Sequence, residues 1–216
     1  MKKIEMLAFM TAVAVAAAAW LGVAMSSATT VDCGASACKA GTDFHANAES
    51  ETELLNKVTL HPPIGTVECA ASTTTLKLQE QGVGPNPAKA SVSELSFEVC
   101  NATVKVLQTG SWDIHTDYTV EENGLVQIRT TSNNVGTVTS TGMEVTIELS
   151  GFHCIFKTNS TLLGRLTGSA VTKGTATLDI GATIPRTGGR SGAFCGSTAQ
   201  MTGAYQFTSP GTLDIT

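Results

Sequence analysis

The chain has 216 residues, of which 14% are charged, 5% are aromatic and 42% are hydrophobic. This length is enough for one sizeable domain, and the hydrophobic fraction is too high for a disordered chain. The formal net charge is −5, and the sequence contains no run of basic residues. An acidic chain of this kind is not expected to bind nucleic acid or an anionic membrane surface.

The N-terminus has the three parts of a secretory signal peptide. Lys2 and Lys3 give a basic start, residues 6–25 carry no charge, and Ser26 and Ala28 are small residues at the −3 and −1 positions of a cleavage site. We predict cleavage after Ala28, which leaves a secreted chain without stable membrane insertion. The alternative is a retained membrane anchor, because the uncharged stretch approaches the ~20 residues that span a bilayer.

Six cysteines follow the predicted signal peptide. An even number of cysteines in a secreted chain predicts a disulfide framework, and many pairings of six cysteines are possible. Their order along the chain favours the pairs Cys33–Cys38, Cys69–Cys100 and Cys154–Cys195. The alternative is a zinc site, but the sequence lacks the closely spaced Cys and His ligands that such a site uses.

Residues 29–59 differ in composition from the rest of the chain. This difference predicts an N-terminal arm that holds the small disulfide loop. Within this arm, the Ala- and Glu-rich stretch 46–55 predicts one or two helical turns. The chain is therefore expected to contain a signal peptide (1–28), this arm (29–59) and a main domain (60–216).

From Leu60 onward, apolar and polar residues alternate with the two-residue period of a half-buried strand. The clearest runs are 94–99, 143–150, 176–183 and 204–208. Glycine-containing segments such as Thr109-Gly110 and Thr141-Gly142 separate these runs and predict turns or corners. Strands that recur every ~8–12 residues are typical of sandwiches and barrels. We predict an all-β fold, an antiparallel β-sandwich of about ten strands.

Three stretches together carry a resemblance to known proteins. They are Gly65-Thr66-Val67-Glu68-Cys69, the run from Leu95 to Cys100 that leads to Gly110-Ser111-Trp112, and the tail from Thr175 through Cys195 to Tyr205 and Pro210. This pattern resembles a large set of secreted, cysteine-paired β-proteins of soil actinobacteria and, more distantly, the alkane-oxidation activator family, some members of which are linked to biofilm matrix. The resemblance implies a fold and an extracellular location, and it implies no catalytic residue.

The segment from Trp112 to Tyr118 holds a candidate metal site. On a strand, Asp113, His115 and Asp117 share one face, and neighbours on a face lie ~7 Å apart. Asp113 and His115 are therefore candidate metal ligands, with a third ligand from another strand. The alternative is that these residues form the solvated face of a strand whose other face packs in the core.

A glycine-rich loop at 188–196 holds a candidate binding site, with Arg186 and Arg190 nearby. Because arginine binds carboxylates with two parallel hydrogen bonds, the loop is a candidate for binding an anion or a sugar carboxylate. The alternative is a flexible connection pinned by Cys195. The loop does not match the phosphate-binding motif that ends in Lys-Ser or Lys-Thr, and we predict no cofactor.

Trp112 is the sole tryptophan after the predicted signal peptide. It is a candidate platform on which a sugar ring stacks, together with Arg186 and Arg190 as polar partners. The alternative is a core anchor, which the apolar residues on the same face favour.

The sequence gives little support for catalysis. It has no Gly-x-Ser-x-Gly motif of the kind that carries a hydrolase serine. The carboxylate pairs Glu94/Glu98 and Glu144/Glu148 alternate with apolar residues, so the solvated face of a strand explains them as well as glycoside cleavage does. We therefore predict that the protein is not an enzyme.

The sequence favours a non-catalytic secreted protein of the cell surface or extracellular matrix. Such a protein would associate with itself through open strand edges or bind cell-envelope polysaccharide. The alternative is an extracellular carbohydrate- or ligand-binding module, which requires Trp112, Arg186 and Arg190 to be accessible. A third hypothesis, a secreted hydrolase, requires a cleft that brings a histidine and carboxylates together.

Overall fold

The structure is a computed structural model that describes residues 28–49, 57–83, 86–115, 117–122, 125–130, 134–190 and 194–216. The predicted signal peptide, except for Ala28, lies outside these residues. Within these ranges, no helix is long and apolar enough to cross a membrane.

The described elements are antiparallel strands with one helical turn among them. In chain order they are β1 (Val31–Asp32), β2 (Asp43–Glu49), β3 (Val58–His61), β4 (Val67–Glu80), β5 (Ala88–Cys100), β6 (Thr103–Gln108), β7 (Ser111–His115), β8 (Asp117–Glu122), β9 (Leu125–Thr130), β10 (Val135–Thr141), β11 (Glu144–Leu149), β12 (Phe152–Lys157), β13 (Thr161–Thr167), α2 (Ser169–Thr172), β14 (Thr177–Gly188), β15 (Thr198–Ser209) and β16 (Asp214–Ile215).

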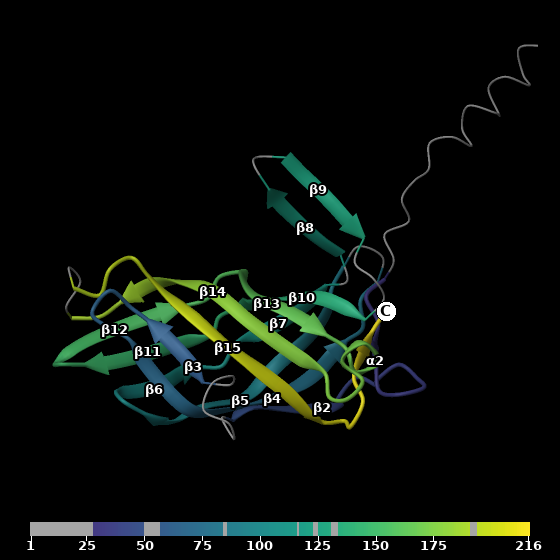
Figure 1. Ribbon diagram of the computed structural model, residues 1–216, viewed down its shortest axis with the longest axis horizontal. Coiled ribbons are helices and arrows are strands. Elements are labelled where there is room, and N and C mark those ends of the chain that lie inside the picture. The colour runs from purple at the N-terminus through teal and green to yellow at the C-terminus, as the bar shows by residue number, and fades with distance from the viewer. Residues whose placement is uncertain are drawn as a thin grey trace, which may run out of the picture.

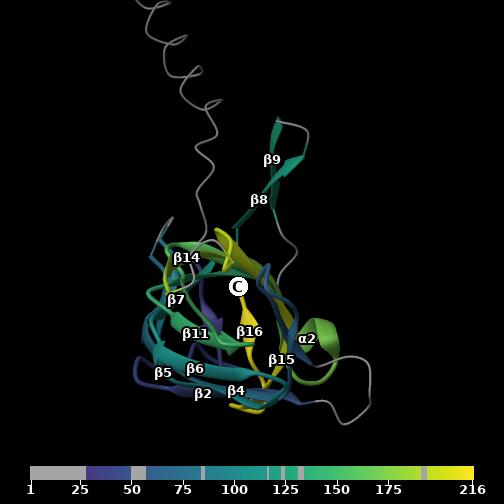
Figure 2. The same ribbon diagram turned by 90° about the vertical axis from the view of Figure 1, so that its left-hand side faces the viewer.

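The main sheet closes on itself into an eight-stranded barrel (Figures 1 and 2). Around the ring the strands follow the order β4, β5, β7, β10, β13, β14 and β15, and β2 and β3 share the eighth position. Both β2 and β3 pair with β15 on one side and with β4 on the other. The prediction of an all-β fold is confirmed, but the prediction of a plain sandwich is wrong. Both architectures produce the same two-residue alternation, so the alternation could not distinguish them.

The segment 29–59 is part of the barrel rather than an arm outside it. It contributes β2 and the first half of β3, the two strands that complete the ring. The helical turns predicted at 46–55 are wrong up to Glu49, because this part forms β2. Backbone hydrogen bonds to strands on both sides outweigh the weak helix preference of Ala and Glu. Residues 50–56 lie outside the described ranges.

Inward-facing side chains fill the barrel. On β14 the alternation is as predicted, since Leu178 and Ile184 are buried whereas Asp179 is exposed. Tyr205 is among the largest fully buried side chains, and its hydroxyl lies 2.6 Å from the Ser72 hydroxyl. The Ser72 hydroxyl donates to a β5 carbonyl, so it accepts from the Tyr205 phenol. Buried hydroxyl groups of this kind are stable only when each has a hydrogen-bond partner.

Three neighbouring strands of the ring bend at the same level. The bends contain Gly110, Gly142 and Ser160, whose φ angles are 76°, 81° and 50°. Such left-handed residues interrupt a strand and turn it. The bends at Gly142 and Ser160 are joined to each other, because Gly142 N donates to the Thr158 carbonyl at 2.9 Å and Met143 N donates to the buried Thr158 hydroxyl at 2.9 Å.

Beyond these bends, β6, β11 and β12 continue as a three-stranded sheet in the order β6–β11–β12. Two residue pairs between β12 and β14, Ile155–Gly188 and Phe156–Arg186, join this sheet to the barrel. On the opposite side of this three-stranded sheet, β6 is the outer strand. It pairs with β11 but forms no ladder with β5 in the described part of the chain. The barrel is therefore continuous at one end and divides into two facing layers at the other.

All three predicted disulfides are confirmed. Cys69–Cys100 joins directly opposite residues of β4 and β5, and Cys154–Cys195 joins β12 to the loop that follows β14. Cys33–Cys38 closes a small loop after β1.

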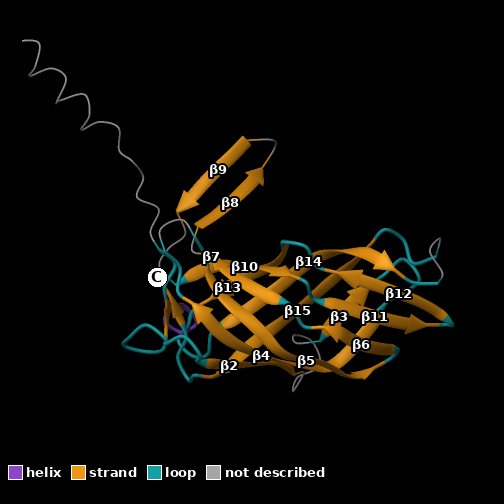
Figure 3. Ribbon diagram, turned by 180° about the vertical axis from the view of Figure 1, so that it is seen from behind, coloured by secondary structure: helices purple, strands orange, loops and turns teal. Residues whose placement is uncertain are grey.

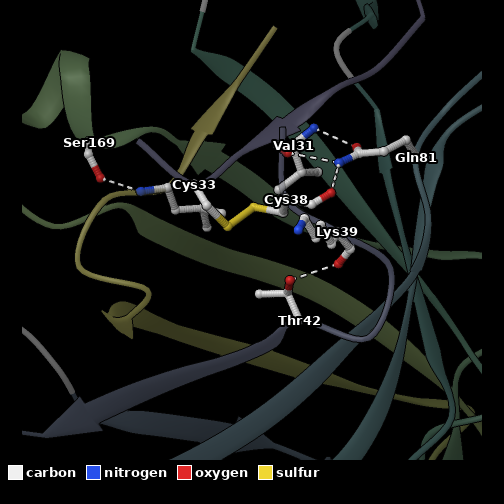
Figure 4. The surroundings of a disulfide bond; sticks show 8 residues. Val31, Cys33, Cys38, Lys39, Thr42, Gln81 and Ser169 are labelled. Carbon is white, nitrogen blue, oxygen red and sulfur yellow. Dashed lines mark hydrogen bonds between the residues drawn. A yellow bond between two sulfur atoms is a disulfide. The ribbon is translucent and has the colours of Figure 1, made fainter. Parts of the chain in front are cut away.

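The Gln81 side chain holds this small loop against the end of β4 (Figure 4). Its amide nitrogen donates to the carbonyls of Val31 and Cys38 at 2.9 and 2.8 Å, and its amide oxygen accepts from Val31 N at 2.8 Å. One side chain thus forms hydrogen bonds with three backbone groups. These bonds hold the loop in place, although the loop has no hydrophobic core of its own.

Both ends of the described chain lie at one end of the barrel. β1 pairs with β16, and Thr30 and Thr216 exchange two backbone hydrogen bonds of 2.7 and 2.9 Å. Asn134 Oδ1 accepts from Ile215 N at 3.1 Å, and Ser169 Oγ accepts from Leu213 N at 2.9 Å. These bonds anchor the C-terminal strand to the loops around it.

The bends predict a graded response to alanine. An alanine Cβ at position 110 would lie 2.4 Å from the Thr141 carbonyl oxygen, whereas at position 142 the nearest atom is 3.7 Å away. Gly142→Ala should therefore lower the free energy of unfolding by about 1–2 kcal/mol, the cost of the left-handed conformation alone. Gly110→Ala should cost clearly more, because the backbone must also move. Urea unfolding of the two variants checks this order, and equal costs would contradict it.

A second prediction concerns alkaline pH. Burial raises the pKa of Tyr205 to about 12. The unfolded phenol titrates near ~10, so the unfolded state loses its proton first and stability falls as pH rises from ~10 to ~12. Between ~pH 9 and ~pH 11 this effect amounts to about 1 kcal/mol, which Tyr205→Phe should not show. Urea unfolding at both pH values measures the difference, and the same pH dependence in both proteins would refute the assignment.

Candidate functional site

The end of the barrel far from the chain termini carries a hollow. Glu148, Gly151, Phe152, His153 and Arg190 line it, and its volume is about 530 Å³. The β11–β12 hairpin provides four of these residues, and Figures 1 and 3 show its turn at the end opposite the C-terminus. The volume lies in the range of sites for small molecules.

A tight turn forms one wall of the hollow. Ser150 and Gly151 connect β11 to β12 with φ angles of 52° and 84°. Two-residue turns with both φ angles positive match the twist of the strands that they join. The turn sets the register of the hairpin, which places Glu148 directly opposite His153.

The loop after β14 forms the other wall, and it is fixed at two points. Its Cys195 is bonded to Cys154, the residue that follows His153. Its Gly189 has a φ of 116°, and a Cβ there would lie 2.2 Å from the His153 carbonyl oxygen. Glycine is therefore required where the loop passes the β12 backbone. These two contacts bring Arg190 beside the β11–β12 turn.

The charges in the hollow are unevenly compensated. Glu148 Oε1 lies 3.7 Å from Lys105 Nζ and 4.0 Å from His153 Nε2, so its negative charge has a positive neighbour. Arg190 is exposed and makes no hydrogen bond or ion pair with the described residues. The hollow therefore offers a guanidinium group whose hydrogen-bond donors are available to a ligand.

An aromatic pair adjoins the hollow, since Phe152 lines it and Phe194 packs on Phe152. The rings of Phe152 and Phe194 have centroids 4.8 Å apart and planes inclined by 36°. Phe194 is 61% exposed, whereas Phe152 is partly buried against the core. In addition, His153 Nδ1 is buried without a hydrogen-bond partner among the described residues. Apolar surface next to unsatisfied polar groups is typical of a ligand site.

The structure separates the three residues predicted to bind a ligand. Arg190 lines the hollow. Trp112 is 3% exposed and lies in the core, so it cannot serve as a stacking platform and the core alternative is confirmed. Arg186 is partly buried, pairs with Phe156 across β14 and β12, and is not among the lining residues.

Asp113 and His115 share the outer face of β7, as predicted, but their neighbours do not complete a metal site. Asp113 lies opposite Lys89 of β5. Glu80, 2.7 Å from Lys89 Nζ, and to a lesser extent Asp113 raise the pKa of Lys89, which keeps a positive charge next to the proposed ligand. Among the described residues, no group of three His, Cys, Asp or Glu side chains could hold a metal ion. The side chain of Asp117 lies outside the described residues.

Sequence reasoning missed most of the hollow. It identified Arg190 but assigned Glu148 to a solvated strand face and left Phe152, His153 and Phe194 aside. A signal was present, because the predicted Cys154–Cys195 bond already places the residues around each cysteine side by side. The two neighbours, His153 and Phe194, could have been found from that bond.

Comparisons with known proteins found no relative of the chain. It matches no family model, no curated protein and no solved structure. The resemblance to secreted β-proteins of actinobacteria and to the alkane-oxidation activator family therefore stays a prediction.

Proposed function

We propose that this chain is a non-catalytic extracellular protein of the cell surface or matrix that binds a ligand at one end of its barrel. The hollow bounded by Phe152, His153 and Arg190 carries this proposal. It combines an available guanidinium group, an aromatic pair with one exposed ring, and two walls held by a disulfide.

The hollow lies at the end of the barrel away from the termini, a position suited to binding a ligand outside the cell. β14 runs from the end that holds the termini to the hollow, and its twelve residues extend roughly 40 Å at ~3.3 Å per residue. The three disulfides are typical of an oxidising compartment outside the cytosol. The hollow would face away from Ala28 whether the chain is released there or held at a membrane.

Binding fits the hollow better than hydrolysis does. Glu148 and His153 lie together, but glycoside cleavage uses two carboxyl groups on either side of the scissile bond. Glu148 is the sole carboxylate among the described lining residues.

Self-association is the second candidate function, and the unpaired side of β6 favours it. A closed ring removes the free edges that polymerisation through the main sheet would need. β6 remains as an edge, but it carries Lys105, and charged residues on an edge oppose pairing between copies. The geometry therefore supports ligand binding over strand-to-strand assembly.

A glycan array tests the proposal. The protein, purified with its disulfides intact, should bind a subset of glycans, and Phe194→Ala and Arg190→Gln should each weaken that binding several-fold by removing groups that face the ligand. Arg165→Gln is the matched control, because Arg165 is exposed on β13 opposite Asp179, far along β14 from the hollow. Binding that is unaffected by both hollow variants would contradict the proposal, as would concentration-dependent polymers that bind no glycan.

A further inference from the structure

We infer that the hollow recognises an acidic saccharide through one sugar ring whose carboxylate binds Arg190. This inference rests on the proposed function and adds the chemical class of the ligand. The argument comes from the balance of charges, the aromatic pair and the shape of the guanidinium group.

The charge balance points to a single negative charge on the part of the ligand that enters the hollow. Lys105 and Glu148 compensate each other at 3.7 Å, which leaves the guanidinium group of Arg190 as the uncompensated charge of the hollow. A planar guanidinium binds a carboxylate with two parallel hydrogen bonds. A phosphate, with up to two negative charges, would carry more charge than this single guanidinium group compensates.

The remaining groups suit the rest of a sugar. The exposed ring of Phe194, which packs on Phe152, offers an aromatic face to the C–H bonds on one side of a pyranose. Glu148 lines the hollow, and its carboxylate oxygens accept hydrogen bonds from sugar hydroxyl groups. The volume of about 530 Å³ accommodates a small saccharide.

A peptide carboxylate fits these observations less well. It would use Arg190 in the same way, but it would not need the aromatic pair, nor a carboxylate such as Glu148 that accepts from hydroxyl groups. An acidic peptide is therefore the contrasting ligand in the test.

Isothermal titration calorimetry with trigalacturonate tests the inference. The protein with intact disulfides should bind trigalacturonate, and the fully methyl-esterified, neutral trisaccharide should bind at least about tenfold more weakly because it lacks the charge. Arg190→Gln should lower the affinity for trigalacturonate about tenfold or more, and Phe194→Ala should lower it about threefold or more. Arg165→Gln should bind as the wild type does.

Three results would overturn the inference: equal binding of the methyl ester, equal binding of an acetylated tri-glutamate peptide, or unchanged affinity in Arg190→Gln. If trigalacturonate fails but another glycan on the array depends on Arg190 and Phe194, the acidic-saccharide inference is wrong and the proposed binding function stands. If no glycan on the array depends on either residue, the proposed function fails as well.

Discussion

A strand can leave a closed ring only where its backbone can turn, and here three neighbouring strands turn together. Gly110, Gly142 and Ser160 supply left-handed φ angles side by side, and the hydroxyl of Thr158 links the second bend to the third. Because of these bends, β6, β11 and β12 separate from the ring as a sheet of their own. The tip of that sheet carries most of the hollow, so the candidate site exists where the barrel divides.

A divided end needs an additional bond to keep its two parts in place. The β6–β11–β12 sheet is joined to β14 by two residue pairs, and Cys154–Cys195 adds a covalent link across a 41-residue separation. On the loop-entropy model such a bond contributes roughly 4 kcal/mol by restricting the unfolded chain. It also sets the position of Arg190 relative to His153 and Glu148, because each wall of the hollow contains one of the cysteines. The bond thus stabilises the fold and defines the site.

The sequence could predict strands, faces and disulfides, but not closure. Alternation on β14 correctly separated buried Leu178 from exposed Asp179, and chain order alone paired the cysteines. Closure of the barrel depends on β2 and β3. Both segments are short, and their sequences, considered alone, resemble an N-terminal arm or a helical turn. Their pairing is a property of distant strands, which local preferences do not encode.

The site was predicted in part for a related reason. Arg190 was identifiable from its glycine-rich loop, whereas Trp112 was a poor candidate because its apolar neighbours had already indicated a core position. The hollow brings together residues 148–153 and residue 190, which are about 40 positions apart, and only a tertiary link places them side by side.

Hydrogen–deuterium exchange of Cys154→Ala/Cys195→Ala, compared with the wild type, tests most directly whether this disulfide builds the hollow. Cys33→Ala/Cys38→Ala is the matched control. We expect exchange at the amides of residues 148–153 and 189–190 to rise at least about tenfold in the first variant alone, while the β4–β5 ladder stays protected. Unchanged exchange at the hollow, or an equal increase throughout the barrel, would contradict this account.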